Sequence, residues 1–415
     1  MKKLLYLNLF VFFISITSFS QNSIEPKVNN KELIEIKNEE SLKKKWFELV
    51  NIRGYVQVRY NKLFETNSNL GCEQCDRSWG GNNSFFIRRG RIILSGQVHD
   101  RVFIYIQPDF ASSAGTTNHI FQIRDAYFDL SLDKDREYRF RIGQSKVPFG
   151  FENMQSSQNR LSLDRNDGLN SAVSNERDLG VFFYWATKQK RELFKKLVDD
   201  GLKGSGDYGL LGIGIYNGQT ANSIERNNNQ HVVARFTYPI EFDNGQIFEA
   251  GVQAYNGKYV VNTLTTGAAK AKLENNNPEY LDQRTAASLI LYPKPFGFQA
   301  EYNIGRGPRY NPASNTIENS HLEGGYVLLN AKTKINNNIV FPFLKYHYYN
   351  GGKKHELDAR SYKVNDLEIG IEWQPFKSFE LVADYTISSR RYEDAVLSDN
   401  KQTGSLLRLQ AQFNF

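Results

Sequence analysis

The chain has 415 residues, a formal net charge of +7, 13% aromatic residues and 11 prolines. Its mean hydropathy is -0.54, and no stretch after residue 20 approaches the roughly 20 apolar residues of a membrane helix, which excludes a bundle of membrane-spanning helices. A transmembrane β-barrel passes this test, because only every second residue of its strands faces lipid.

Residues 1–20 have the pattern of an export signal. Lys2 and Lys3 precede the apolar core "LLYLNLFVFFISI", and the small residues "TSFS" follow. The core is short for a spanning helix, so cleavage near Ser20 is expected. Residues 21–46 are charged and lack glycine, and we expect a short periplasmic extension there, helical or disordered, with a plain linker as the alternative.

Residues 47–415 are predicted to form one all-β domain. Alternation of apolar and polar residues marks half-buried strands, and the connectors between them alternate between short and long. This pattern predicts a transmembrane antiparallel β-barrel with short periplasmic turns and long outer loops. Connector 191–207 breaks the rule, because it is long where a short turn is due. The sixteen predicted strands are 50–60, 84–98, 101–110, 120–132, 137–148, 179–190, 208–217, 230–242, 246–261, 284–294, 296–306, 324–335, 339–350, 362–375, 378–391 and 405–415.

Cys72 and Cys75 form the motif "CEQC" in the first outer loop. In an oxidising compartment this spacing predicts a local disulfide. A metal site would need further ligands, and neither a second cysteine pair nor a histidine cluster follows in the sequence.

Predicted strand 84–98 has three arginines. An arginine on the lipid face near the middle of the membrane costs about 2–4 kcal/mol. Because Gly90 and Ile92 belong to the lipid-facing set, Arg89 and Arg91 are predicted to face a water-filled interior. Arg88 has the opposite parity, so it lies near the outer rim or a β-bulge turns it inward.

Further arginines alternate in the same way on other strands. Arg59 belongs to the polar set of strand 50–60, and Arg139 and Arg141 to that of strand 137–148. Any one of them could be a solvated charge at the rim. Together, fixed cations in a narrow passage attract anions, and arginine suits phosphate-like oxyanions because its fork donates two parallel hydrogen bonds.

Acidic residues moderate this expectation of anion selectivity. The loop 149–178 contains charges of both signs: Glu152, Asp164, Asp167, Glu176 and Asp178 against Arg160, Arg165 and Arg177. Further carboxylates are expected inside the barrel: Asp109, Asp129, Glu368, Glu372 and Asp384.

The last strand, 405–415, alternates and stops on Phe415. It resembles the C-terminal recognition signal of outer-membrane barrels, which ends in an aromatic residue. Barrel assembly machinery is therefore an expected partner. Enzyme motifs are absent from the sequence, and its six histidines are scattered, so neither an enzyme nor a cofactor is predicted.

Five segments resemble the phosphate-selective porins O and P, in their Bacteroidetes branch: "GYVQVRY", "FFIRRGRIILSGQV", "IRDAYFDL", "IGQSKVPFGFE" and "RDLGVFF". The resemblance implies a trimeric, sixteen-stranded barrel whose third outer loop, here 149–178, folds inward. It also implies a constriction with paired arginines, an aspartate and a lysine. By motif, these are Arg88 and Arg89, Asp125, and Lys146.

The sequence therefore predicts a diffusion porin in the outer membrane of a Gram-negative bacterium. Its expected cargo is small inorganic anions, with phosphate, pyrophosphate or polyphosphate favoured, and its expected neighbours are outer-membrane lipid and two further copies of the chain. A general or sugar-type porin with weak ion selectivity is the alternative. A secreted soluble β-protein that acts as a binder is a third reading. Export and alternating strands argue against a nucleic-acid partner despite the basic balance.

Overall fold

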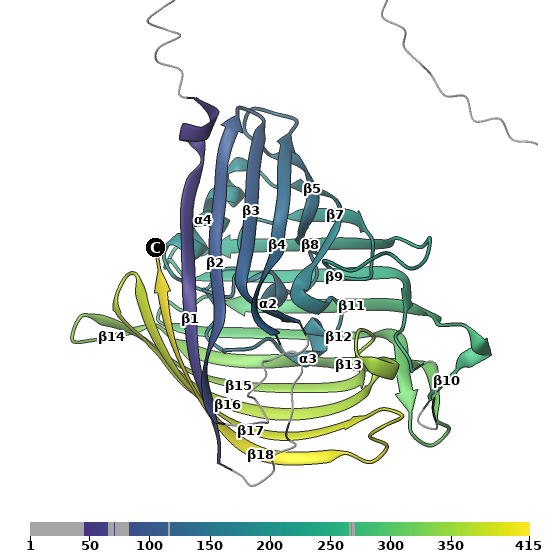
Figure 1. Cartoon of the computed structure of the whole chain (residues 1–415). Helices are drawn as coiled ribbons and strands as arrows, with labels where there is room; N and C mark the ends of the chain where they lie inside the picture. The colour runs from purple at the N-terminus through teal and green to yellow at the C-terminus, as the bar shows by residue number, and fades with distance from the viewer. Residues whose placement is uncertain (1–44, 65–69, 71–82, 115–116, 265–266, 268–269) are drawn as a thin grey trace, which may run out of the picture. The chain divides into compact units, whose positions relative to one another are not determined.

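The structure, a computed structural model, describes residues 45–64, 70, 83–114, 117–264, 267 and 270–415 (Figure 1). The predicted signal peptide, all but the end of the predicted extension, and the Cys72–Cys75 pair lie outside these residues. Only the 3-10 helix η1 (Trp46–Leu49) precedes the first strand within the described part.

The described residues form one sheet of eighteen strands. Two of them, β10 (Lys272–Leu273) and β14 (Thr333–Ile335), have only two and three residues, so sixteen long strands remain, as predicted. These are β1 (Asn51–Leu63), β2 (Ser84–His99), β3 (Val102–Ala114), β4 (Thr117–Ser131), β5 (Tyr138–Lys146), β6 (Arg177–Trp185), β7 (Leu211–Tyr216), β8 (His231–Glu241), β9 (Ile247–Val260), β11 (Glu279–Leu291), β12 (Phe296–Asn311), β13 (Thr316–Ala331), β15 (Asn338–Gly352), β16 (Ser361–Phe376), β17 (Phe379–Glu393) and β18 (Lys401–Asn414).

The sixteen strands close into an antiparallel barrel. Each long strand pairs with the next along the chain, and β1 pairs with β18 from Tyr55 opposite Asn414 to Leu63 opposite Leu406. Closure satisfies the edge hydrogen bonds that an open sheet would leave unpaired. The predicted all-β barrel is therefore confirmed.

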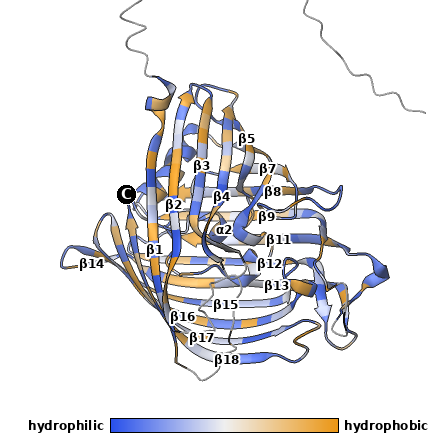
Figure 2. Cartoon of the chain, in the orientation of Figure 1, coloured by the Kyte–Doolittle hydropathy of each residue, from blue (hydrophilic) through white to orange (hydrophobic). Residues whose placement is uncertain are grey.

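Side chains alternate between the two faces of the wall. In β8, Val233 and Arg235 are buried inside the barrel, whereas Val232 and Phe236 are exposed on its outer face. Figure 2 shows hydrophobic and hydrophilic residues alternating along β1 to β4. An apolar outer face with a polar inner face is the arrangement that a surrounding lipid phase selects.

The connector after β6 contains helix α4 (Lys188–Asp199) at the barrel end that has the short turns. The predicted strand 179–190 was too long, because β6 ends at Trp185 and Lys188 is the first residue of α4. Phe194 and Leu197 lie three residues apart and are the buried residues of the helix. Gly201, with a φ of 62°, follows its C-terminus and supplies the left-handed residue that such ends favour.

The other described helices are short: α2 (Phe151–Met154), α3 (Asp167–Asn170), η2 (Ser174–Glu176), η3 (Glu274–Asn276) and η4 (Leu357–Ala359). Within the described ranges, no helix has the length and apolarity needed to cross a membrane.

Deletion of Phe415 should impair assembly of the barrel several-fold. Its backbone exchanges two hydrogen bonds with Gly54 of β1, of 2.9 and 3.0 Å, and its ring covers Gly54 so closely that a Cβ there would lie 2.5 Å from the ring. The deletion removes both contacts where the first and last strands meet. The fraction of heat-modifiable protein on a gel measures assembly; Phe415→Tyr should assemble normally, and an unimpaired deletion would contradict this role.

Candidate functional site

Residues 147–176, between β5 and β6, turn into the barrel, and we call them the inner loop. The backbone N–H groups of Phe151 and Glu152 donate to the carboxylate of Glu301 on β12, at 2.5 and 2.8 Å. Gly150, with a φ of 87°, allows the chain to turn inward because glycine accepts positive φ at little cost. Figure 1 shows α2 and α3 of this loop among the barrel strands.

The far part of the inner loop lies against the wall of β11 to β13. Arg284 of β11 donates to the carbonyl oxygen of Gly168 at 3.0 Å and to the hydroxyl of Ser171 at 2.7 Å. Gly168 itself packs on the backbone of β13, where an added Cβ would lie 2.7 Å from the carbonyl carbon of Gly324. The loop therefore crosses the interior rather than projecting out of it.

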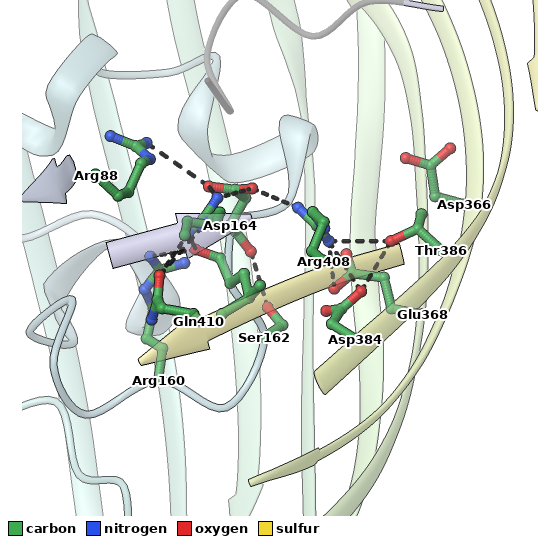
Figure 3. Close-up of polar contacts among 12 residues, drawn as sticks. Arg88, Arg160, Ser162, Asp164, Asp366, Glu368, Asp384, Thr386, Arg408 and Gln410 are labelled. Atoms are coloured by element: carbon green, nitrogen blue, oxygen red, sulfur yellow. Dashed lines mark hydrogen bonds and ion pairs between the residues drawn. The ribbon is translucent and has the colours of Figure 1, made fainter. Parts of the chain in front are cut away.

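Asp164 fastens the inner loop to the first and last strands (Figure 3). Its carboxylate lies 3.2 Å from Arg59 Nη1 of β1 and 2.5 Å from Arg408 Nη1 of β18. Burial opposes ionisation of Asp164, but the positive charges of Arg59, Arg408 and Arg88 hold the pKa of its carboxyl below the usual value.

Two further carboxylates of the loop also bind cations of the wall. Glu152 Oε1 lies 2.5 Å from Lys345 Nζ of β15. Asp167 lies 2.7 Å from Lys353 Nζ and 3.0 Å from Arg390 Nη1 of β17. Asp164, Glu152 and Asp167, three of the acidic residues that moderate the expected anion selectivity, are thus engaged in holding the loop.

Two of the predicted pore arginines are neutralised on the wall. Arg91 donates from Nε to Asp109 at 2.7 Å. Arg141 makes a two-pronged contact with Asp129, at 2.7 and 2.9 Å. All four side chains are buried inside the barrel. Such pairs order the wall and contribute little net field to the interior.

Arg139 and Asp125 each form an ion pair with another residue. Arg139 Nη2 lies 2.5 Å from Asp207, which in turn receives a 2.8 Å hydrogen bond from Arg191 of α4. Asp125 of β4 accepts from Nε and Nη2 of Arg177, both at 2.9 Å. Arg177 is the first residue of β6, whereas the sequence-based prediction placed it in the loop 149–178.

Lys146 ends β5 and points into the barrel, where it is 6% exposed. Its ammonium group donates to the carbonyl oxygens of Met154 and Gln155, at 2.7 and 2.6 Å. Lys146 has the same strand parity as the apolar residues Phe140 and Ile142, so parity alone does not predict that its side chain points inward. The structure directs Lys146 to the backbone of the inner loop.

Arg88 faces inward because β2 contains a bulge. Gln57 lies opposite Arg89 and Val58 opposite Ile87, so Arg88 is the extra residue. Its Nη2 lies 3.7 Å from Asp164. Of the two positions that the sequence allowed for Arg88, the bulge is the one adopted.

Arg88, Arg89 and Arg160 form what we call the arginine cluster. Arg89 donates to Gln57 at 2.8 Å, and Arg160 of the inner loop donates to the carbonyl oxygen of Leu163 at 3.2 Å. The positive charges of Arg88 and Arg160 both repel that of Arg89. In Figure 3, Arg88 is drawn above and Arg160 below the level of Asp164, both on its left.

The arginine cluster contains donors that the described part of the chain leaves unsatisfied. The Nε groups of all three arginines are buried without a hydrogen-bond partner there, and so is Nη1 of Arg160. Arg89 and Arg160 are 4% and 6% exposed. A buried donor without an acceptor is costly, so the cluster is suited to an anionic ligand. Sequence reasoning missed Arg160 as a partner of Arg88 and Arg89, since only the inward fold of the loop brings it there.

The chain matches the family model of phosphate-selective porin O and P over residues 71–415. It belongs to that porin family. No curated protein sequence matches it. Porins are outer-membrane channels, so the polar interior is a passage, and the short turns mark the periplasmic end.

Solved structures of other outer-membrane proteins share the porin barrel. The outer membrane channel DcaP of Acinetobacter baumannii matches with a TM-score of 0.53 and 16% identity, over 88% of this chain and 97% of that chain. OmpF of Salmonella typhi, in complex with daunomycin, matches with a TM-score of 0.53 and 13% identity, over 88% of this chain and 97% of that chain. OmpT of Vibrio cholerae in its trimer form matches with a TM-score of 0.50 and 10% identity, over 88% of this chain and 99% of that chain. These likenesses concern the fold alone.

Proposed function

We propose that this porin passes small anions by diffusion, with phosphate, pyrophosphate or polyphosphate favoured, past a constriction at the arginine cluster. The observation that carries the proposal is the set of buried guanidinium donors of Arg88, Arg89 and Arg160. Asp164 is the one carboxylate in ion-pair contact with the cluster within the described residues, at Arg88. It also binds two wall arginines, so the cluster keeps an excess of positive charge.

The cluster can replace part of the hydration shell of an oxyanion. Guanidinium groups donate paired hydrogen bonds that match phosphate oxygens, and the protein around them lowers the dielectric constant, which strengthens the attraction. An anion that enters from water therefore trades water donors for fixed N–H donors. Binding at such a point must stay weak enough for release toward the periplasm.

The alternative, a general porin with weak ion selectivity, is favoured by one observation. Apart from the arginine cluster, many inward cations are paired with carboxylates, such as Arg91 with Asp109 and Arg141 with Asp129. Balanced charges along the wall reduce the field that an approaching ion feels. Selectivity should accordingly arise at the cluster rather than along the whole passage.

We also propose that the porin works as a homotrimer, in line with the trimer form recorded for the OmpT neighbour. Each protomer would then provide its own passage, because the inner loop and the arginine cluster both belong to one chain.

Reversal potential across a planar bilayer tests the proposed function. In a potassium chloride gradient the purified porin should give the sign of an anion-selective channel, and added phosphate should reduce the chloride current with saturation at modest concentration. A reversal potential near zero, or of cationic sign, together with no effect of phosphate, would favour the general porin instead.

A further inference from the structure

Three cations lie side by side on the outer face of the barrel, at the end with the long loops. Lys363 of β16 stands directly opposite Arg391 of β17, which stands directly opposite Lys401 of β18. All three have outward parity: the neighbouring Arg390 is buried inside, whereas Lys363 and Lys401 are exposed and the Arg391 side chain is 42% exposed. We call these three residues the cation row.

Among the described residues, the carboxylates near the cation row are too few to neutralise its three positive charges. Like charges directly opposite one another on neighbouring strands are destabilising. Glu393 and Asp399 both approach the same nitrogen, Arg391 Nη1, at 2.9 Å. Both carboxylates therefore contact Arg391, and in the described part of the chain neither lysine of the row has a carboxylate partner.

A small pocket accompanies the row. Its volume is about 240 Å³, and Ser389 and Asn365 line it together with the cations. Asn365 accepts a 3.0 Å hydrogen bond from the hydroxyl of Tyr346, so its amide nitrogen can donate elsewhere. The pocket thus offers ammonium, guanidinium, hydroxyl and amide groups, all of which can donate hydrogen bonds to a phosphate group.

The row lies just beyond the apolar band of the barrel. Ile387, on the same strand and face as Arg391, is 49% exposed and stands opposite Leu367. Arg391 is four residues further along, which is about 13 Å at the usual rise per residue of a strand. A lipid whose chains cover Ile387 would bring its headgroup to the level of the row.

We propose that the cation row binds a phosphate group in the headgroup of an outer-leaflet lipid. The outward face and the adjoining apolar residues favour a lipid over a phosphate ion from solution, because the lipid gains contact with both. Basic clusters that flank an apolar span are recognised as sites for anionic headgroups. The row is on the opposite face of the wall from the arginine cluster, so this site is independent of the proposed transport.

Retention of lipid by the purified porin tests the site. The full-length protein is incubated in detergent with bisphosphorylated lipid A, or with lipid A from which both phosphates have been removed, and bound lipid is counted by native mass spectrometry. The triple variant Lys363→Gln, Arg391→Gln, Lys401→Gln should retain at least fivefold less phosphorylated lipid than the unaltered porin. The dephosphorylated lipid should bind both proteins equally weakly.

A matched control neutralises three exposed lysines at the periplasmic end: Lys134→Gln, Lys188→Gln, Lys195→Gln. This control should retain lipid normally. The double variant Lys363→Gln, Lys401→Gln keeps the ion pairs of Arg391 and should still lose most of the retention, so a folding defect at Arg391 cannot mimic the result. Both row variants should keep the reversal potential of the unaltered porin.

Two outcomes would overturn the proposal. Equal retention of phosphorylated lipid by the triple variant and the unaltered porin would exclude the row as its binding site. Complete displacement of the lipid by millimolar inorganic phosphate would identify a site for the free ion instead.

Discussion

Replacing Arg89 with alanine should weaken the block of ion current by phosphate about tenfold, which corresponds to about 1.4 kcal/mol of binding free energy. Arg89 is 4% exposed, and its Nε has no hydrogen-bond partner among the described residues. Its loss removes donors and a fixed charge from a poorly screened passage. Anion-to-cation selectivity, measured from reversal potential, should fall in parallel.

Arg160→Ala should act in the same direction, because Arg160 presents two unsatisfied nitrogens to the same cluster. Lys188→Ala is the control: Lys188 starts α4, its side chain is 62% exposed, and it lies outside the arginine cluster. If phosphate block and reversal potential were unchanged in both Arg89→Ala and Arg160→Ala, these arginines would be solvated charges with no role in anion binding. Lys146→Ala is a less direct test, since Lys146 holds the loop backbone.

Replacing Asp164 with alanine should loosen the inner loop and lower the thermal stability of the folded porin. Arg59 and Arg408 would lose the carboxylate that holds the loop to them. Removal of one partner of a buried ion pair costs about 3–5 kcal/mol, and water in the passage should keep the loss at the lower end. We expect a lower unfolding temperature, noisier single-channel current and stronger anion selectivity.

Asp199→Ala is the matched control for Asp164→Ala. Asp199 is also an aspartate paired with a basic residue, Lys195, but its side chain is 54% exposed on α4, where an ion pair contributes little. Circular dichroism during heating and single-channel recording would compare the two variants. If Asp164→Ala matched the control in both measurements, the carboxylate would not fasten the loop.

The barrel followed from periodicity because a lipid phase outside and water inside impose a two-residue repeat on every strand. Strand ends were harder to place. The segment predicted at 324–335 is β13, Thr316–Ala331, since its hydrogen-bond ladder continues into water beyond the apolar band. Helix α4 was missed for a related reason: two-residue alternation was the criterion, and the buried pair Phe194 and Leu197 has helical spacing instead.

The candidate site could be predicted only in part. Inward parity predicted the position of Arg89. A bulge was one of two possibilities for Arg88, and only the register of β1 and β2 shows that the bulge is present. The partners of Asp164 are separated from it by 105 and 244 residues along the chain. No local pattern encodes such contacts, because they depend on how the inner loop crosses the interior of the barrel.

The contacts of Asp164 have a consequence for the order of folding. Arg59 belongs to β1 and Arg408 to β18, the two strands whose pairing completes the ring. The Asp164 carboxylate therefore bridges β1 and β18 from inside the barrel. It can contact both arginines only after these two strands have paired. The contacts of the loop with β11, β12 and β15 do not need that pairing, so we expect only the part of the loop around Asp164 to become fixed when the ring closes.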